Sequence, residues 1–344
     1  MHEARVLVVD DSAAMRALFS DILDQTKNVR VVGTAASADA ARDAIEELQP
    51  NVITLDVEMP GMSGIEFLEE IMASKPLPVV MLSGLTQSGT AVSLKAYELG
   101  AVECFPKPLK ATPDEFSKTV GKLGKIVLAA ANSNLRAKPR QVAARAVNAV
   151  DFVWNGHVVA LSAGMGGIDA LSILLTNWPK NCPPTVICLQ TETALAEAFV
   201  ARLDSELNCS VCAVKDGAQL NQGTVHVTTD SSRHVVVEAG QPARLRFLER
   251  DAIEGARPSA NLLFGTLARV GLPAAGAVLS GMGSDGAKGL KLLRDSGCDT
   301  FAQDRATATV SEAPTAAVEN GAVTTELALE ELGANILKTC SQGG

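Results

Sequence analysis

The 344-residue chain has no long uninterrupted hydrophobic run. No apolar stretch approaches the roughly 20 residues that a helix needs to cross a bilayer. The opening residues Met1 to Arg5 lack the apolar stretch of a secretory signal peptide. We therefore expect a cytoplasmic protein that does not insert directly into a membrane.

An excess of positive charge is also missing. The 30 lysines and arginines are outnumbered by 39 acidic residues, which gives a net charge of -9. Nucleic-acid affinity rests on clustered basic side chains that contact phosphate. No helix-turn-helix pattern with a basic face follows the first domain. We expect no nucleic-acid partner.

Cysteine is present, but not in the even number that a disulfide framework needs. Of the seven cysteines, Cys209 and Cys212 form a C-x-x-C pair. This pair lies in a predicted strand, where residues three apart face opposite sides. No second pair or nearby histidine in the sequence completes a zinc site. Reduced, buried thiols are the simpler interpretation.

What the chain does have is a regular alternation of apolar strands with helical stretches. From Arg5 to Lys107, five such strands predict a parallel sheet covered by helices on both faces. A helix near Pro113 to Ala131 ends this unit. We assign residues 1–124 to a first domain, 125–151 to a linker, and 152–340 to a second domain. The basic residues of the linker are Arg136, Lys138, Arg140 and Arg145.

The second unit alternates in the same way, with a strand-rich middle from Val211 to Leu248. Its strands predict a second α/β domain with a mainly parallel sheet. The last predicted helices cover Asp285 to Asp295, Ser311 to Glu319 and Glu326 to Thr339. The composition, 47% hydrophobic and 20% charged, is that of an ordinary soluble protein, which we expect to be monomeric.

Polar side chains stand where the apolar strands of the first unit end. Asp10 and Asp11 follow one strand, and Asp56, Ser83 and Lys107 follow three others. The carboxyl ends of parallel strands meet at one edge, so these side chains should converge. Carboxylates are ligands for Mg²⁺, Asp56 can attack phosphorus, and Lys107 with Ser83 can meet the phosphate charge. For any one of these positions, a cap of the next helix is the simpler interpretation, and Asp11 or Ser12 could be that cap. The agreement of all four strand ends favours the phosphoryl site instead.

The motifs around these residues resemble a two-component receiver domain. They are Val8 to Ser12, Asp56 to Gly64, and Lys107-Pro108. The resemblance implies a flavodoxin-like fold with Mg²⁺ held by Asp10, Asp11 and Asp56. It also implies that Asp56 accepts a phosphoryl group from a chemotaxis histidine kinase.

One position departs from the receiver pattern. Receivers usually carry an aromatic residue three places before the lysine, whereas this chain has Cys104 there and Phe105 next. Successive side chains of a strand point to opposite faces, so Phe105 is not a simple substitute. The sequence therefore supports phosphorylation better than it supports the usual transmission of the signal.

Two glycine-rich turns mark the second domain, at Ser162 to Gly167 and at Ser280 to Gly286. Glycines let backbone N–H groups approach a ligand or form an anion hole, although tight strand-to-helix packing explains each turn equally well. With a receiver and a linker before it, the Gly281 to Gly286 motif resembles the chemotaxis protein-glutamate methylesterase family, commonly called CheB. Further matching stretches are Arg257-Pro258-Ser259, Phe199, Arg202-Leu203 and Asp216-Gly217.

This second resemblance implies a serine hydrolase triad that removes methyl esters from the cytoplasmic tails of methyl-accepting chemoreceptors. It also implies frequent deamidation of receptor glutamines and activation by receiver phosphorylation. In this chain the nucleophile position is Gly164, the base position is Gln190, and only the carboxylate Asp285 is kept. The amide near Met282 would contribute to an anion hole.

The two substitutions remove the groups that do the chemistry. Glycine cannot be acylated, and a glutamine amide cannot accept and return a proton near neutral pH. We therefore expect a phosphorylation-controlled response regulator whose output domain is inactive and acts by binding.

Two alternatives stay open. A relocated nucleophile such as Ser162, with Ser280 and Ser284 as further candidates, would preserve esterase activity, but no histidine is in obvious reach. A nucleotide-binding module is the more remote alternative. Gly164-x-Gly166 follows a strand, as in the dinucleotide fingerprint, but Asp169 occupies the third glycine position.

Overall fold

The computed structural model describes residues 2–84, 87–107, 113–135 and 152–343. The chain divides into two compact units, Met1–Pro139 and Arg140–Gly344. The basic residues of the predicted linker lie outside the described residues, and the domain bounds drawn from the sequence stay a prediction. None of the described helices is long and apolar enough to cross a bilayer.

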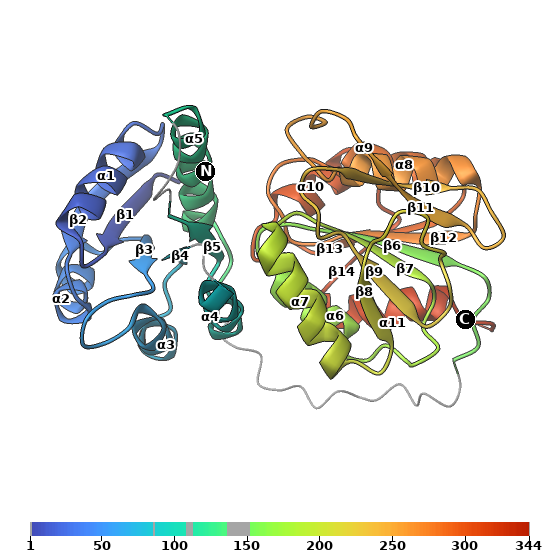
Figure 1. Ribbon diagram of the computed structural model, residues 1–344, viewed down its shortest axis with the longest axis horizontal. Helices are drawn as coiled ribbons and strands as arrows, with labels where there is room; N and C mark the ends of the chain where they lie inside the picture. Colours follow the sequence, from blue (N-terminus) through green and yellow to red (C-terminus); the bar gives the residue numbers. More distant parts are fainter. Residues whose placement is uncertain (1, 85–86, 108–112, 136–151, 344) are drawn as a thin grey trace. The chain divides into compact units, whose positions relative to one another are not determined.

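The N-terminal unit is a parallel sheet of five strands in the order β2-β1-β3-β4-β5, which is the flavodoxin-like order. Helices α1 and α5 pack together on one face, and α3 packs against α4 on the other (Figure 1). The strands are β1 (Ala4–Val9), β2 (Val29–Ala35), β3 (Val52–Asp56), β4 (Val79–Ser83) and β5 (Glu103–Pro106). The helices are α1 (Ala13–Asp24), α2 (Ala38–Leu48), α3 (Gly64–Ser74), α4 (Gln87–Leu99) and α5 (Pro113–Ala131).

Local sequence signals fix where these elements start and end. The central strands β3 and β4 are buried along their whole length, as expected for parallel strands covered on both faces. Helix α1 begins after Ser12, whose Oγ accepts a hydrogen bond from Met15 N. Helix α3 begins with a capping box between Ser63 and Glu66. Asp10 and Asp11 directly follow β1 and Asp56 is the last residue of β3, so these polar residues lie at one edge of the sheet.

The C-terminal unit is a parallel sheet of seven strands in the order β14-β13-β12-β6-β7-β9-β8, joined by an antiparallel hairpin of β10 and β11. The strands are β6 (Val158–Ala163), β7 (Thr185–Leu189), β8 (Ser210–Ala213), β9 (Thr224–Val227), β10 (His234–Glu238), β11 (Arg244–Leu248), β12 (Ala274–Val278), β13 (Asp299–Gln303) and β14 (Thr325–Leu327). The helices are α6 (Gly167–Leu175), α7 (Thr193–Glu206), α8 (Ala260–Val270), α9 (Ala287–Asp295), α10 (Glu312–Glu319) and α11 (Leu329–Thr339).

Helices α8, α9 and α10 lie on one face of this sheet with the hairpin, and α6 and α11 pack together on the other (Figure 1). A core of fully buried side chains, including Val186, Leu245, Phe264 and Leu290, fills the space between the sheet, the hairpin, α8 and α9. The predicted α/β architecture, with a parallel sheet in each unit, is confirmed.

Two predicted helix starts in the C-terminal unit are wrong. The stretch from Glu326 was expected to be helical, but Thr325–Leu327 forms β14, whose Thr325 pairs with Phe301 of β13. The backbone and side chain of Thr324 bond to Thr300, which holds this segment against the sheet edge. Helix α9 begins at Ala287 rather than Asp285, because Gly286 adopts a left-handed conformation with φ of 98°.

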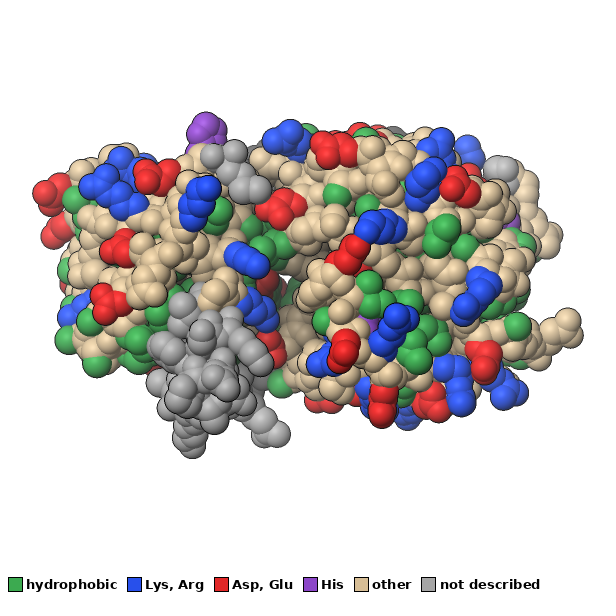
Figure 2. Space-filling model, turned by 90° about the horizontal axis from the view of Figure 1, so that it is seen from above, with side chains coloured by type: hydrophobic (Ala, Val, Ile, Leu, Met, Phe, Trp, Pro, Cys, Tyr) green, Lys and Arg blue, Asp and Glu red, His purple; other side chains and the backbone are tan. Residues whose placement is uncertain are grey.

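The surface visible in Figure 2 mixes charges of both signs. Basic and acidic side chains alternate over the described residues of this face. No extended basic area of the kind that binds a phosphate backbone is visible there.

Candidate functional site

The acidic residues at the strand ends of the N-terminal unit converge as predicted. One carboxylate oxygen from each of Asp10, Asp11 and Asp56 lies within 4.8 Å of the others. Asp10 and Asp56 are buried, and Asp11 is exposed. The cap of α1 is Ser12, so Asp11 is not needed for that role. Its carboxylate therefore remains part of the cluster.

Lys107 completes this cluster at the end of β5. Its Nζ lies 2.8 Å from Asp10 Oδ2 and 2.7 Å from Asp56 Oδ1. Its backbone N–H donates to Ser83 O at 2.8 Å, which ties the ends of β4 and β5 together. Ser83 is buried at that same edge. The five residues singled out from the sequence thus share one site.

Burial and pairing shift the pKa values in this cluster. Burial raises the pKa of Asp56, and the hydrogen bond and charge of Lys107 oppose that rise. Burial alone would lower the pKa of Lys107, but its bonds to Asp10 and Asp56 raise that pKa above its usual value. The lysine therefore stays a cation beside the carboxylates.

The cluster has the donors and the charge that a divalent cation requires. Three carboxylates and one ammonium carry a combined charge of -2 when all are ionised. Mg²⁺ prefers hard oxygen ligands and keeps several waters, which needs an open side. A cavity of about 640 Å³ provides that opening, and Asp11, Asp56, Glu58 and Lys107 are among its lining residues. The residues present fit Mg²⁺.

The position of the missing aromatic residue has an unexpected neighbour. Cys104 is buried, and its Sγ donates to Ser93 O at 3.6 Å. Tyr97 of α4 packs there, accepts a hydrogen bond from Cys104 N at 3.1 Å and bonds Glu103. The only tyrosine of the chain thus joins α4 to β5. Tyr97 was not among the residues predicted from the sequence, because it lies in α4 and not at the strand position where receivers usually carry the aromatic residue.

In the C-terminal unit, the first glycine turn connects the end of β6 to α6. Gly166 adopts φ of 72° as the N-cap of α6, and a Cβ there would lie 2.6 Å from Thr309 Cβ. A side chain at this position would be strained both by its backbone and by its surroundings. The turn therefore needs glycine at 166, whereas Gly164 has no such restriction in the structure.

The space beside Gly164 is open to a side chain. A Cβ built there would lie 3.4 Å from Gly281 Cα, 3.6 Å from Gln190 Oε1 and 3.9 Å from Met282 N. These are ordinary van der Waals distances. The nucleophile, base and anion-hole positions implied by the sequence thus surround one point.

Gln190 lies directly after β7 and contacts the third triad position. Its Nε2 donates to Asp285 Oδ2 at 2.7 Å and to Pro258 O at 3.2 Å. The contact between base position and carboxylate is therefore kept, with an amide in place of an ionisable ring. An amide in this place cannot carry a proton between substrate and carboxylate.

Asp285 also organises the start of α8. Its carboxylate accepts hydrogen bonds from Ser259 Oγ at 2.7 Å, Ala260 N at 2.6 Å and Asn261 N at 3.2 Å. The first amides of a helix lack partners within that helix, and a carboxylate there also meets the positive end of the helix dipole. Asp285 therefore has a structural task that does not depend on catalysis.

The serines considered as relocated nucleophiles lack a basic partner. Ser280 is fully buried, and its Oγ donates to Met165 O at 2.7 Å and accepts from Val310 N at 2.9 Å. Ser162 is buried within β6, between β7 and β12. Ser284 is exposed in the second glycine turn.

The histidines of the C-terminal unit are engaged elsewhere. His157 precedes β6, at the opposite end of that strand from Gly164, and bonds Asn155. His226 bonds Cys212 and Gln219. His234 accepts from Ser259 N and its Nε2 bonds Asp251 O. This arrangement does not favour catalysis from Ser162, because none of these rings bonds to that serine.

The strand-turn-helix of the nucleotide-binding alternative is present, but its third glycine is not. Asp169 lies in the first turn of α6. A carboxylate at that place would repel a phosphate bound at the helix N-terminus. The geometry therefore disfavours a nucleotide.

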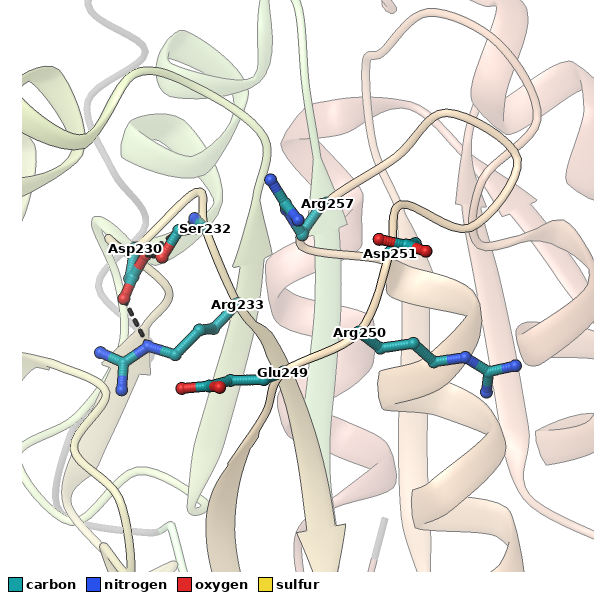
Figure 3. Close-up of a pocket in the computed structure, with 7 residues that line it drawn as sticks. All are labelled: Asp230, Ser232, Arg233, Glu249, Arg250, Asp251 and Arg257. Carbon is teal, nitrogen blue, oxygen red and sulfur yellow. Dashed lines mark hydrogen bonds and ion pairs between the residues drawn. The ribbon is translucent and has the colours of Figure 1, made fainter.

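No signal in the sequence indicates a cavity of about 730 Å³ that is lined by residues that precede β10, follow β11 and precede α8 (Figure 3). Arg257, which directly precedes the Pro258 carbonyl that Gln190 contacts, donates to Ser231 O at 3.2 Å. Arg233 pairs with Asp230 at 2.6 Å and stacks on the ring of Phe247. The lining contains three arginines and three acidic residues, so the cavity has no excess charge that would select an anion. The lining residues are Asp230, Ser232, Arg233, Glu249, Arg250, Asp251 and Arg257.

Comparison with known proteins gives two family matches. A CheB methylesterase model matches residues 159–336, and a response regulator receiver model matches residues 6–120. The chain is 41% identical over 344 residues to protein-glutamate methylesterase/protein-glutamine glutaminase 1 of Caulobacter vibrioides, covering 99% of each chain. It is also 41% identical over 341 residues to the corresponding protein of Agrobacterium fabrum, covering 97% of this chain and 96% of that protein.

A solved structure supports the fold of the second domain. The CheB methylesterase catalytic domain of Thermotoga maritima matches with a TM-score of 0.51 at 24% identity. The match covers 53% of this chain and 98% of that one. The likeness is one of fold.

Proposed function

Because the chain belongs to the CheB methylesterase family and carries a receiver domain, we propose that it is a chemotaxis response regulator whose second domain binds its target without hydrolysing it. The observation that carries this proposal is the pair of substitutions at Gly164 and Gln190. The relatives are named for action on protein glutamate esters and glutamines, and those groups are the targets we assign to this chain.

Loss of two triad members should lower the rate of ester hydrolysis by a large factor. In a serine hydrolase, removal of the nucleophile or the base alone costs on the order of a millionfold in turnover. That factor corresponds to about 8 kcal/mol in the activation barrier. The amide of Met282 would leave at most the residual effect of an anion hole, about 10³ to 10⁴ over water. Such a rate would not sustain a signalling enzyme.

The receiver site is proposed to be functional. An oxygen of Asp56 attacks phosphorus and forms a P–O bond, while the P–N bond of the kinase phosphohistidine breaks. Asp10, Asp11 and Asp56 would hold Mg²⁺, which when bound neutralises charge on the phosphoryl oxygens. Lys107 and Ser83 are placed to meet the remaining charge on the aspartyl phosphate.

The partners that follow are a chemotaxis histidine kinase and the cytoplasmic tails of methyl-accepting chemoreceptors. A chain that binds such tails without hydrolysis would compete with an active enzyme for the same sites. It would also drain phosphoryl groups from the kinase. Both effects oppose the output of an active enzyme.

The test is an assay of methanol release. The protein, treated with acetyl phosphate and Mg²⁺, is incubated with methylated receptor fragment, and we expect no release above buffer. Turnover that is lost in Ser162→Ala would overturn the proposal and establish a relocated nucleophile.

A restored variant provides the positive control. Gly164→Ser with Gln190→His should regain methanol release, because a Cβ at position 164 fits at van der Waals distance and position 190 already contacts Asp285. Each single substitution should remain inactive, since nucleophile and base act together. Activity in the double variant would locate the defect at these two positions.

A further inference from the structure

The amide group of Gln190 is held in one orientation. Its Nε2 faces two acceptors, Asp285 Oδ2 at 2.7 Å and Pro258 O at 3.2 Å. Because only the NH₂ end of an amide can donate to both, the opposite atom must be the carbonyl oxygen. The contacts of Nε2 with Asp285 and Pro258 thus orient Gln190 Oε1 away from these two residues.

That oxygen is directed toward the space beside Gly164. A Cβ at Gly164 would lie 3.6 Å from Gln190 Oε1 and 3.9 Å from Met282 N. Gly281 N donates to Val310 O and Gly283 N to Glu312, whereas no acceptor for Met282 N occurs in the described part of the chain. The space is therefore bordered by one hydrogen-bond acceptor and one available donor.

The space is also accessible from solvent. Gly164, Gln190, Met282 and Asp285 are all half-buried rather than enclosed. Without a serine side chain at position 164, the volume that a nucleophile would fill is available to a ligand. A ligand side chain that reached the turn would lie between Gln190 Oε1 and Met282 N.

We propose that this altered triad is a binding site selective for a primary carboxamide, the side-chain group of glutamine, over its methyl ester and its carboxylate. A carboxamide offers an NH₂ donor to Gln190 Oε1 and a carbonyl acceptor to Met282 N. The chain is thus a reader of glutamine at the positions that its relatives hydrolyse. This inference rests on the proposed function, because it names the state of the target that the inactive domain binds.

We expect the methyl ester and the carboxylate to bind more weakly than the carboxamide, for different reasons. A glutamate methyl ester has no N–H, so Gln190 Oε1 would lose its partner on binding. A carboxylate also lacks a donor, and it would place its charge near Gln190 Oε1 with Asp285 behind it. A site built to pair with a donor rejects an analogue that lacks the donor far more strongly than an apolar pocket rejects a missing methylene.

The experiment compares one purified cytoplasmic receptor fragment in three states. Its modification sites carry glutamine, glutamate or enzymatically formed glutamate methyl ester, and the dissociation constant of each for the full-length protein is measured by fluorescence anisotropy with acetyl phosphate and Mg²⁺. We expect the glutamine form to bind about tenfold or more tightly than the ester form. Because both groups are uncharged, overall electrostatics cannot produce that difference.

A matched pair of variants assigns the preference to one residue. Gln190→Met keeps a similar volume without the acceptor and should reduce the preference to less than about twofold. Gln222→Met is the control, because Gln222 is an exposed glutamine of the same unit that bonds Asn181. It should leave the preference unchanged. If Gln190→Met does not fold, Gly164→Leu, which fills the space, should also abolish the preference.

The binding measurements distinguish failure of the carboxamide preference from failure of the proposed binding function. Equal binding of the glutamine and ester forms by the parent protein would overturn the inference and leave the proposed binding function in place. Failure to bind any of the three forms would overturn the proposed function itself. A preference that persists in Gln190→Met or Gly164→Leu would place the selectivity elsewhere and overturn the inference.

Discussion

Single residues decide what each site can do. Asp56 is only 3% exposed, and burial raises its pKa while Lys107 opposes the rise. Its carboxylate nevertheless borders the cavity of the receiver site, where a phosphoryl donor can approach. Gln190 occupies the corresponding central place in the second site but has no proton to exchange in the physiological range. We therefore propose a nucleophile in the first site and only hydrogen-bonding groups in the second.

Replacement of Asp56 tests the first of these statements. Asp56→Asn should abolish uptake of phosphate from acetyl phosphate, because the amide cannot form the acyl phosphate. Uptake is measured as the mass increase of the intact protein. Glu58→Gln, which changes another carboxyl group of the same cavity, should still take up phosphate. Undiminished uptake by Asp56→Asn would show that the acceptor lies elsewhere.

The start of helix α8 depends on a carboxylate from another part of the chain. Asp285 lies in the turn before α9, yet its carboxylate bonds the first amides of α8, at Ala260 and Asn261. Gly286, with φ of 98°, delays the start of α9 and places Asp285 outside that helix. The carboxylate of Asp285 therefore stabilises the start of α8 whether or not it takes part in catalysis.

Removal of that carboxylate should destabilise the protein. We expect Asp285→Ala to lower the free energy of unfolding by about 1–3 kcal/mol, since it strips acceptors from buried donors at the start of α8. Asp295→Ala is the control, because its exposed pairing with Lys291 should contribute less than about 1 kcal/mol. Both are measured by urea denaturation. Equal values for the two variants would contradict the structural role of Asp285.

The molecule as a whole consists of two units whose unfolding can be followed separately. Both tryptophans, Trp154 and Trp178, belong to the C-terminal unit, and the single tyrosine belongs to the N-terminal unit. Tryptophan fluorescence therefore reports on the methylesterase-like unit alone. A two-state free energy is assigned to that unit rather than to the full chain.

The stability of the C-terminal unit should depend on pH through His226. Burial lowers the pKa of His226, and its neutral ring accepts from Cys212 Sγ and donates to Gln219 O. A lowered pKa means that this stabilisation is complete above the ordinary value, about 6.5, and is lost as the pH falls through the folded-state pKa. The free energy of unfolding, followed by tryptophan fluorescence, should decrease between pH 7.5 and pH 5.5.

His226→Gln isolates this contribution. Its amide can still donate to Gln219 O but does not titrate in this range. The variant should therefore lose less stability over the same pH interval than the parent protein does. An identical decrease in both proteins would assign the pH dependence to other groups.

Much of the fold follows from local patterns. Apolar runs that end at glycine-rich turns or polar residues predicted the order of strands and helices, because burial and backbone hydrogen bonding act over short stretches. The errors at Asp285 and Glu326 lie at helix starts. The long-range pairing with β13 decided the conformation of the segment at Thr325, whereas the left-handed backbone of Gly286 moved the start of α9.

The sequence by itself determined which chemical groups the two sites contain. Parallel strands bring their ends together, so Asp10, Asp56 and Lys107 could be placed in one cluster from their positions alone. The absence of a nucleophile and a base at Gly164 and Gln190 is likewise a property of the sequence. Both conclusions depend on residue type and strand order, which need no side-chain coordinates.

Only the tertiary structure decided how those groups face one another. The orientation of the Gln190 amide and the capping of α8 by Asp285 each join segments distant in the chain. Tyr97 approaches β5 from the helix that directly precedes that strand. The sequence places no histidine close to Cys212, yet β9 brings His226 Nδ1 to 3.3 Å from Cys212 Sγ. Side-chain orientation depends on which partners packing brings within hydrogen-bond distance, and no local pattern contains that information.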